Sequence, residues 1–242
     1  MPTRWYQGKV TAIKDLTAET KQFSVEIQNE EDVFDFLPGQ FVTFDLPVSD
    51  KRLNRWRSYS IANHPDQSNT LEFCIVRSAD GLATKYLFEE ATVGTMMKFK
   101  GPDGGFVLPK DLYKEIVFIC TGTGIAPFRS MLNHIKARNL DFQRVNLIFG
   151  TRYDYTILYE EELKEMKAVF PQFDYSIALS RQNTGQYHHG YVHDIYQAQF
   201  KEVDANRHFY LCGWSSMIDE AVSNLIVRMG YAPNQIHYEL YG

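Results

Sequence analysis

The spacing of apolar residues changes close to residue 110, and this change limits the chain to a two-part fold. Before it, six short segments rich in β-branched and aromatic residues are separated by turn residues. These segments are residues 9–17, 20–28, 40–47, 57–63, 70–78 and 95–102. Such a series of short strands predicts an antiparallel β-barrel or sandwich, with one helix inside it near residues 82–90.

After about Lys110, apolar strands alternate with helical patterns. The expected strands are residues 115–120, 144–150, 174–180, 208–213 and 235–242, and the expected helices are 126–139, 160–170 and 216–230. This alternation predicts a parallel sheet with helices on both faces. We therefore expect two domains, an antiparallel β-barrel over residues 1–110 and an α/β domain over residues 111–242, with the boundary near Asp111.

Charge and composition exclude several classes of protein. The net charge is −5, which argues against general attraction to nucleic acid. No apolar run approaches the roughly 18–20 residues that span a bilayer, and the first residues have no apolar signal-peptide core. The three cysteines, Cys74, Cys120 and Cys212, are widely spaced and odd in number. We therefore expect a cytoplasmic protein without a disulfide framework, zinc or an iron–sulfur cluster.

The stretch ICTGTGIAPF, residues 119–128, has the order strand, tight loop, helix. Gly122 and Gly124 allow a sharp turn and a close approach of the backbone to a ligand. Pro127 fits the first turn of a helix, where its missing N–H has no cost. The loop and the helix N-terminus therefore predict a phosphate site. A glycine-rich turn without a ligand is the alternative.

Two further segments in the first half could contact an anionic, ring-shaped ligand. Thr84, in the sequence GLAT at residues 81–84, could cap the following helix or face a phosphate. In RSYSIAN, residues 57–63, the alternation of a strand places Arg57, Tyr59 and Ile61 on one face. Stacking on tyrosine, hydrogen bonds from serine and charge from arginine would suit such a ligand, although a plain polar edge strand has the same pattern.

These motifs occur in one order, and the chain resembles the ferredoxin–NADP reductase family, including the reductase components of bacterial oxygenases. Five segments carry the resemblance, and it covers nearly the whole chain. They are RSYS at 57–60, GLAT at 81–84, GPDGGF at 101–106, TGTGIAPFRS at 121–130 and YLCGWSSM at 210–217. The resemblance implies a flavin-binding barrel followed by a pyridine-nucleotide domain, with the two redox rings meeting face to face between them.

The resemblance also implies roles for individual residues. Tyr59 would lie against the isoalloxazine ring, Ser60 near the flavin N5, and Arg57 at the flavin phosphate. The predicted catalytic residues are Ser60, Cys212, Glu239 and Tyr241. The predicted cofactor-binding residues are Arg57, Ser58, Tyr59, Ser60, Gly81, Leu82, Ala83, Thr84, Thr121, Gly122, Thr123, Gly124, Pro127, Arg152, Ser180, Arg181, Cys212, Gly213, Met217 and Tyr241.

The C-terminal sequence HYELYG resembles family endings in which an aromatic residue covers the flavin. Tyr241 is the candidate, and it would move aside for the nicotinamide. Glu239 could act as an acid or as a charge that tunes the flavin. A plain final edge strand is the alternative, and the extra Gly242 departs from endings in which the aromatic is last.

The resemblance implies that FAD accepts hydride from the nicotinamide and passes electrons on singly. The chain has no C-x4-C-x2-C run for its own iron–sulfur cluster, so we expect a separate ferredoxin or flavodoxin as partner. Ferredoxins are typically acidic, and the basic residues of segment 51–57 could dock one, or could simply be a solvated loop. They are Lys51, Arg52, Arg55 and Arg57.

The choice of nicotinamide cofactor depends on donors for a 2′-phosphate. Ser180 and Arg181 match the pair that NADP-dependent members place after the third strand of this domain, and Arg152 is a second candidate. The segment HHGYVHDIY lacks further lysine or arginine and resembles enzymes that use NADH. We expect NADPH and FAD, with NADH and FMN left open.

Three other functions compete with a stand-alone ferredoxin or flavodoxin reductase. They are an NADH-dependent oxygenase reductase subunit, an NAD(P)H:flavin reductase, and a non-catalytic flavin relay inside a complex. A relay could lose its nicotinamide contacts, but the segments TGTGIAP, Ser180–Arg181 and CGWSSM are all present. The sequence therefore disfavours the relay.

Overall fold

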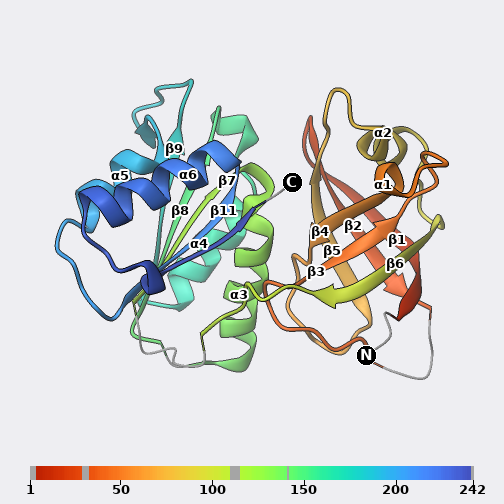
Figure 1. Cartoon of the computed structure of the whole chain (residues 1–242), viewed down its shortest axis with the longest axis horizontal. Helices are drawn as coiled ribbons and strands as arrows, with labels where there is room; N and C mark the ends of the chain where they lie inside the picture. Colours follow the sequence, from red (N-terminus) through yellow and green to blue (C-terminus); the bar gives the residue numbers. More distant parts are fainter. Residues whose placement is uncertain (1–3, 29–32, 110–114, 141, 241–242) are drawn as a thin grey trace. The chain divides into compact units, whose positions relative to one another are not determined.

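The computed structural model describes residues 4–28, 33–109, 115–140 and 142–240, which form two compact units (Figure 1). The first unit comprises Met1–Leu108 and Ala126–His134, and the second comprises Pro109–Ile125 and Ile135–Gly242. The predicted boundary at Lys110 and Asp111 lies outside the described residues. Each unit is treated separately below.

The first unit is built on an antiparallel sheet with the strand order β4-β3-β6-β1-β2-β5. An isolated antiparallel bridge between Ile61 and Phe73 joins the two edge strands, so the sheet closes into a barrel. Closure removes the exposed edges that would otherwise pair with other chains. The strands are β1 Trp5–Thr17, β2 Thr20–Ile27, β3 Phe41–Asp45, β4 Trp56–Ser60, β5 Thr70–Val76 and β6 Met96–Asp103.

Aromatic side chains fill the barrel. Phe44 lies edge-on to Phe73 at 5.0 Å between ring centroids, and Phe99 lies 5.5 Å from Phe44. All three are buried. Helix α2, Leu82–Glu89, adds Ala83 and Leu87 to the same cluster, which confirms the helix expected there. A four-residue helix, α1 at Arg52–Arg55, was not predicted.

The second unit is built on a parallel sheet with the strand order β10-β9-β8-β7-β11-β12. With the barrel, it confirms the predicted combination of an antiparallel and a parallel domain. The strands are β7 Glu115–Thr121, β8 Arg144–Thr151, β9 Phe173–Leu179, β10 His188–His189, β11 Arg207–Gly213 and β12 Ile236–Leu240.

The main helices of this half of the chain are α3 Ile125–Arg138, α4 Glu160–Val169, α5 Val192–Gln199 and α6 Ser215–Ser223. Helix α5 and the short strand β10 were not predicted. The helix predicted to run to Gly230 instead ends at Ser223 and continues as a π-helical turn, Asn224–Arg228. Gly230 has a φ of +80°, which stops the helix as expected. No helix among the described residues is long and apolar enough to cross a membrane.

Helices α5 and α6 lie across one face of the parallel sheet (Figure 1). Alternate residues of the central strands, such as Val117 and Ile119 of β7, point into this layer. They meet Tyr196 of α5 and Leu225, which are both fully buried. The central strands therefore read as continuous apolar runs because both of their faces are covered.

Strand β7 starts this domain in the middle of the sheet, and the chain then moves outward through β8 and β9. It returns to place β11 on the other side of β7. The carboxyl ends of β7 and β11 therefore flank the point where the winding direction reverses. Ligands of such sheets bind at this point. We call this side of the sheet the carboxyl edge and the opposite side the amino edge.

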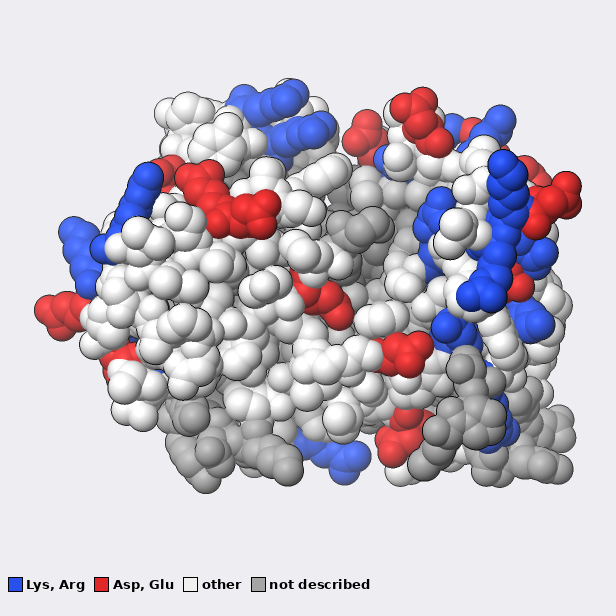
Figure 2. Space-filling view, in the orientation of Figure 1, with Lys and Arg blue, Asp and Glu red and all other residues white. Residues whose placement is uncertain are grey.

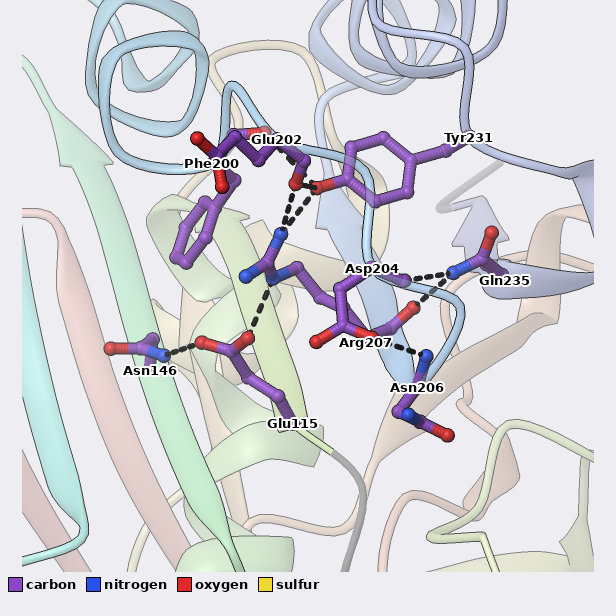
Figure 3. A network of polar contacts seen from close by, with 9 residues as sticks. All are labelled: Glu115, Asn146, Phe200, Glu202, Asp204, Asn206, Arg207, Tyr231 and Gln235. Atoms are coloured by element: carbon purple, nitrogen blue, oxygen red, sulfur yellow. Dashed lines mark hydrogen bonds and ion pairs between the residues drawn. The ribbon is translucent and has the colours of Figure 1, made fainter.

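The amino edge is closed by a network of polar contacts around Arg207 (Figure 3). Its Nε donates to Glu115 Oε2 at 2.7 Å, and its Nη1 donates to the carbonyl of Glu202 at 2.8 Å and to the hydroxyl of Tyr231. Asn146 donates to the other oxygen of Glu115 at 3.3 Å. Burial opposes the charge of Arg207, but the hydrogen bonds to Tyr231 and Glu115 outweigh it and raise the pKa of Arg207.

Candidate functional site

The candidate flavin segment lies on β4, at the edge that closes the barrel. Tyr59 packs its ring 6.0 Å from Phe44 and is partly buried. Burial raises the pKa of Tyr59 to about 12, although the nearby charge of Arg57 opposes the rise. The phenol is therefore neutral at any physiological pH. Ser60 is buried, and the Ser58 hydroxyl lies 2.9 Å from the hydroxyl of Thr43.

Arg57 is anchored by the backbone around it. Its Nη1 donates to the carbonyl of Leu53 at 3.0 Å and to that of Trp56 at 2.7 Å. Both carbonyls belong to α1 and its end, so this short helix holds the guanidinium in place. Because a guanidinium has five donors in a fixed fork, two bonds from one nitrogen leave others for an anion.

The second candidate anion site begins at Gly81, which is the N-cap of α2. The prediction that Thr84 caps this helix is wrong, because Thr84 lies three residues inside it. Its hydroxyl bonds to the carbonyls of Gly81 and Ser78 at 3.1 and 3.2 Å, and it also accepts from the Ser78 amide. A Cβ on Gly81 would lie 2.7 Å from that hydroxyl, so only glycine fits there. The amides of Leu82 and Ala83, at the start of the helix, are the donors left for an anion.

At the carboxyl edge of the second unit, the two glycines of the TGTG loop have different tasks. Gly122 has a φ of +53°, and no atom lies within 4 Å of the position of an added Cβ. A Cβ on Gly124 would lie 2.3 Å from the carbonyl oxygen of Cys212. Gly122 therefore leaves open space above the loop, whereas Gly124 lets the loop pack against β11. The sequence had predicted the ligand-facing task for both.

The loop after β11 interlocks with the TGTG loop. Gly213 has a φ of +139°, and a Cβ there would lie 2.3 Å from Thr121 Oγ1. The same Thr121 oxygen accepts a hydrogen bond of 3.1 Å from the Trp214 amide. A 3₁₀ turn, η1 at Gly122–Gly124, then leads into α3, and Pro127 lies in its first turn as predicted. The two loops at the switch point are therefore packed and hydrogen-bonded together.

The structure places two predicted site residues in the core. Cys212 is fully buried and lies in register with Cys120 on β7 and Glu239 on β12. Burial raises the pKa of the Cys120 thiol, and the neighbouring Cys212 adds to the rise. Met217 packs into the apolar layer under α6. Both residues are therefore buried core residues that pack beside the carboxyl edge.

The residues that follow β8 and β9 extend the sheet ladder beyond the strands. The Ser180 amide donates to the Thr151 carbonyl at 2.9 Å, and the Arg181 amide donates to the Arg152 carbonyl at 3.1 Å. The side chains of Arg152 and Arg181 are exposed. The structure therefore brings together the two arginines that the sequence singled out separately.

Comparison with known proteins matches a different domain type to each half of the chain. The sequence profile of the oxidoreductase FAD-binding domain matches residues 7–108, and that of the oxidoreductase NAD-binding domain matches residues 118–223. The ferredoxin–NADP reductase B of Sorangium cellulosum is 26% identical over 242 residues, which cover 98% of this chain and 97% of that protein. The chain belongs to the ferredoxin–NADP reductase family.

Other proteins similar to this chain include oxygenase components and a solved ferredoxin NADP⁺ reductase. The toluate 1,2-dioxygenase electron transfer component of Pseudomonas putida is 29% identical over 239 residues, covering 98% of this chain and 67% of that protein. The chain spans 61–67% of the length of several oxygenase and hydroxylase components that are 29–30% identical to it. A ferredoxin NADP⁺ reductase from Neisseria gonorrhoeae with bound FAD and NADP superimposes with a TM-score of 0.82 at 24% identity, covering 97% of this chain and 98% of that one.

The donor sets of this FAD-dependent oxidoreductase fit the two cofactors. In the first unit, a partly exposed neutral tyrosine, an anchored arginine and the amide-rich start of α2 suit a flavin and its phosphates. In the second unit, the open space above Gly122 and the two exposed arginines suit a phosphorylated dinucleotide. No group of three or more His, Cys, Asp and Glu side chains in the described part of the chain could hold a metal ion.

Some expected contacts fall outside what the structure describes, and other contacts were missed. Tyr241 lies outside the described residues. The sequence reasoning overlooked the pair Asp154 and Gln182, which joins the loops after β8 and β9 through two hydrogen bonds. It also overlooked Trp56, whose ring contacts both Arg52 and Lys100. Asp154 and Gln182 lie 28 residues apart and Trp56 and Lys100 lie 44 apart, so neither pair has a local sequence signal. Arg52 is only four residues before Trp56, but the contact depends on the short helix α1, which was not predicted.

Proposed function

We propose that the chain is an NADPH-dependent flavoprotein reductase that exchanges single electrons with a ferredoxin or flavodoxin. The observation that carries this proposal is the pairing at the carboxyl edge of an open glycine turn at Gly122 with exposed Arg152 and Arg181. That combination suits the pyrophosphate and the 2′-phosphate of NADPH. The bound flavin would accept a hydride from NADPH and release its electrons singly.

The chain's own residues would bind and orient the cofactors. The ring of Tyr59 offers an apolar surface that stays neutral, and Ser60 lies next to it on β4. Arg57 and the first amides of α2 would hold the flavin phosphates. We propose that Cys212, which is fully buried, acts by shaping the strand end and that Glu239 and Tyr241 border the flavin. We also propose the domain boundary near residue 110.

The preference for NADPH can be tested on Arg181. We expect Arg181→Ala to raise the KM for NADPH at least tenfold and to leave the KM for NADH nearly unchanged, because only NADPH carries the 2′-phosphate. The matched control is Arg144→Ala, an exposed arginine at the other end of β8. The purified protein should be yellow and should bleach anaerobically with NADPH. A colourless protein that does not bind FAD would refute the proposed function. A KM for NADPH in Arg181→Ala equal to that of wild type would refute the assignment of Arg181 to the 2′-phosphate.

The electron partner would dock on the barrel unit, where Figure 2 shows Lys and Arg side chains gathered over the strands. Two tryptophans there, Trp5 and Trp56, lie 5.5 Å apart. Arg52 and Lys100 lie 4.1 and 4.5 Å from the Trp56 ring centroid, and Lys98 lies 4.8 Å from that of Trp5. We call these five residues the basic-aromatic patch. It combines positive charge with flat apolar surface, which suits an acidic protein partner.

We propose a docking set that differs from the one predicted from the sequence. Arg55 pairs with Asp45 at 2.7 Å, and Arg57 is partly buried, so neither offers a free charge at this surface. Lys98 and Lys100 of β6 take their place beside Arg52. We expect Lys100→Glu to slow electron transfer to an acidic ferredoxin at low salt, with NADPH-to-ferricyanide activity unchanged. Lys14→Glu, an exposed lysine on β1 outside the patch, is the control.

A second candidate function is the reductase subunit of an oxygenase with a separate iron–sulfur protein. The names of several relatives favour it, since they are electron transfer components of dioxygenases and hydroxylases. Reconstitution with a ferredoxin from each class would separate the two candidates.

Placement in the cytoplasm is also part of the proposal, and the three free cysteines support it.

A further inference from the structure

The last two residues of the segment TGTGIAPFRS, Arg129 and Ser130, lie beyond its glycine turn. They are in the second turn of α3, within the stretch Ala126–His134 that belongs to the first unit. Ser130 is fully buried, and the Arg129 side chain is only 14% exposed. Polar side chains buried to this extent need hydrogen-bond partners. Partners of both lie in the segment RSYSIAN, residues 57–63.

Both side chains bond to backbone carbonyls that follow Ser60. Arg129 Nη1 donates to the Ala62 carbonyl at 3.1 Å, and the Ser130 hydroxyl donates to the Asn63 carbonyl at 2.6 Å. Strand β4 ends at Ser60, so these carbonyls lie just past the end of the strand. Backbone carbonyls in buried segments require partners. Helix α3 therefore supplies two of the bonds that hold the chain where it leaves β4.

An ion pair strengthens this attachment. The same Arg129 nitrogen lies 2.6 Å from Glu72 Oε2 on β5. The backbone of Glu72 is itself bonded to the segment, since its carbonyl accepts from the Ala62 amide at 2.7 Å and its amide donates to Asn63 Oδ1 at 2.8 Å. Residues 62 and 63 are therefore held from two sides, by β5 and by α3.

Apolar contacts fix this part of α3 independently of the polar bonds. The ring of Phe128 lies 5.7 Å from that of Phe106 between centroids. Gly39 has a φ of +101°, and a Cβ there would lie 2.5 Å from Met131 Cε. The helix is therefore already packed within the first unit, and the bonds from Arg129 and Ser130 add direction to that packing.

We propose that Arg129 and Ser130 are positioning residues for the flavin. This inference rests on the proposed function, in which Tyr59 and Ser60 orient the flavin. By holding the two residues that follow Ile61, they fix the end of β4 and with it the direction of the Ser60 side chain. A displacement of about 1 Å in such a group can lower a rate about 100-fold. The segment TGTGIAPFRS then has two tasks, a glycine turn for the nucleotide and a polar pair for the flavin segment.

Two substitutions in the FAD-loaded protein test this. Ser130→Ala removes one hydroxyl, and Arg129→Met removes the charge while it keeps a long side chain. We expect each to raise the Kd for FAD about three- to tenfold, as the loss of a hydrogen bond predicts. The Kd is measured from the release of FAD on dilution. The visible absorption of the bound FAD should shift, and kcat with NADPH should fall about tenfold or more in Arg129→Met. The Kd for NADP⁺ should stay within about twofold of wild type, because the glycine turn is unchanged.

Two further variants separate positioning from a general loss of structure. Arg129→Lys keeps a cation for Glu72 and the Ala62 carbonyl, so it should recover most of the flavin properties lost in Arg129→Met. Arg138→Met replaces an exposed arginine in the last turn of the same helix and should change none of them. Spectra are compared at saturating FAD and without urea, where lower stability alone does not alter them.

The possible failures are distinguishable. If both variants lower only the urea midpoint, with FAD affinity, spectrum and kcat unchanged, the positioning role is overturned and the proposed function stands. A raised Kd for NADP⁺ with unchanged flavin properties would also overturn it, because the two residues would then serve the nucleotide. If Arg129→Met does not fold, a Ser130→Ala protein with the FAD spectrum and affinity of wild type would still overturn it. Wild-type protein that does not bind FAD would overturn the proposed function itself.

Discussion

The two edges of the parallel sheet are built in opposite ways from the same strands. At the amino edge, Arg207, Glu115 and Tyr231 are largely buried, and their hydrogen bonds satisfy one another (Figure 3). At the carboxyl edge, glycines occupy the turns, and Arg152 and Arg181 extend into solvent. One edge uses its polar groups in internal hydrogen bonds, whereas the other leaves its two arginine side chains exposed. Stability and binding can therefore be altered separately, by changes at opposite ends of one sheet.

The largest predicted loss of stability comes from a substitution at the amino edge. Glu115→Ala leaves the guanidinium of Arg207 buried without its carboxylate, and removal of one partner of a buried ion pair costs about 3–5 kcal/mol. We expect urea unfolding to show a loss of this size, with the KM for NADPH unchanged in the folded protein. Lys167→Ala is the control, because its ion pair with Asp174 is exposed and should contribute below about 1 kcal/mol. A raised KM in Glu115→Ala would show that the edges are coupled.

A smaller effect should separate the two glycines of the TGTG loop. Gly124→Ala forces a Cβ against the carbonyl of Cys212, and overpacking of this kind costs about 1–3 kcal/mol. Gly122→Ala meets no atom and should lose only about 1 kcal/mol through its left-handed φ. We expect the opposite order for NADPH binding. Relative to its loss of stability, Gly122→Ala should lower the affinity for NADPH more than Gly124→Ala does. Equal unfolding midpoints for the two variants would contradict the packing role of Gly124.

The next effect depends on pH and concerns His193, at the start of α5. Its Nδ1 lies 2.9 Å from the Tyr196 hydroxyl, and its Nε2 lies 3.4 Å from a carboxylate oxygen of Glu220. Burial lowers the pKa of His193, against the opposing charges of Glu220 and Asp194. The unfolded chain therefore takes up the proton first, and stability falls as the pH drops below about 6.5, by at most about 1.4 kcal/mol per pH unit.

Urea unfolding between pH 7.5 and 5.5 measures this dependence. His193→Gln should flatten it, because glutamine does not titrate in that range. An unchanged pH profile in His193→Gln would assign the dependence to another group.

The smallest expected effect tests the interlocked loops at the switch point. Thr121→Val removes the oxygen that accepts from the Trp214 amide, and a single hydrogen bond of this kind contributes about 0.5–1.5 kcal/mol. We expect a loss near the lower end, since Trp214 is exposed and water can replace the bond. NADPH affinity should fall with it, whereas Thr121→Ser, which keeps the hydroxyl, should resemble wild type in both measurements.

The two folds were predictable because their signals are local. Short β-branched segments and long apolar runs distinguish the barrel from the parallel sheet within a few residues. Helix α5 was missed although Val192, Ile195 and Tyr196 have helical spacing. The helix has only eight residues, and such short helices depend on packing, here of Tyr196 and its neighbours against the sheet.

The sites were predictable only in part. Glycine spacing located the turn at Gly122, but the packing task of Gly124 depends on Cys212, 88 residues away in a strand that the sequence does not place beside it. In the same way, the internal use of the Thr84 hydroxyl depends on how the loop at Ser78 folds back. The arginines at 152 and 181 were identified singly, and their pairing follows from the adjacency of β8 and β9.

The order of residues along this chain determined its two periodicities, the position of its glycine turns and the types of side chain offered to a cofactor, because each of these depends on neighbours within one element. Only the tertiary structure decided which polar groups bond internally and which stay available. Hydrogen bonding and burial join residues that are distant in the chain, as Asp154 with Gln182 and Glu115 with Arg207 show. That division between satisfied and available groups is what separates the amino edge of the sheet from the carboxyl edge.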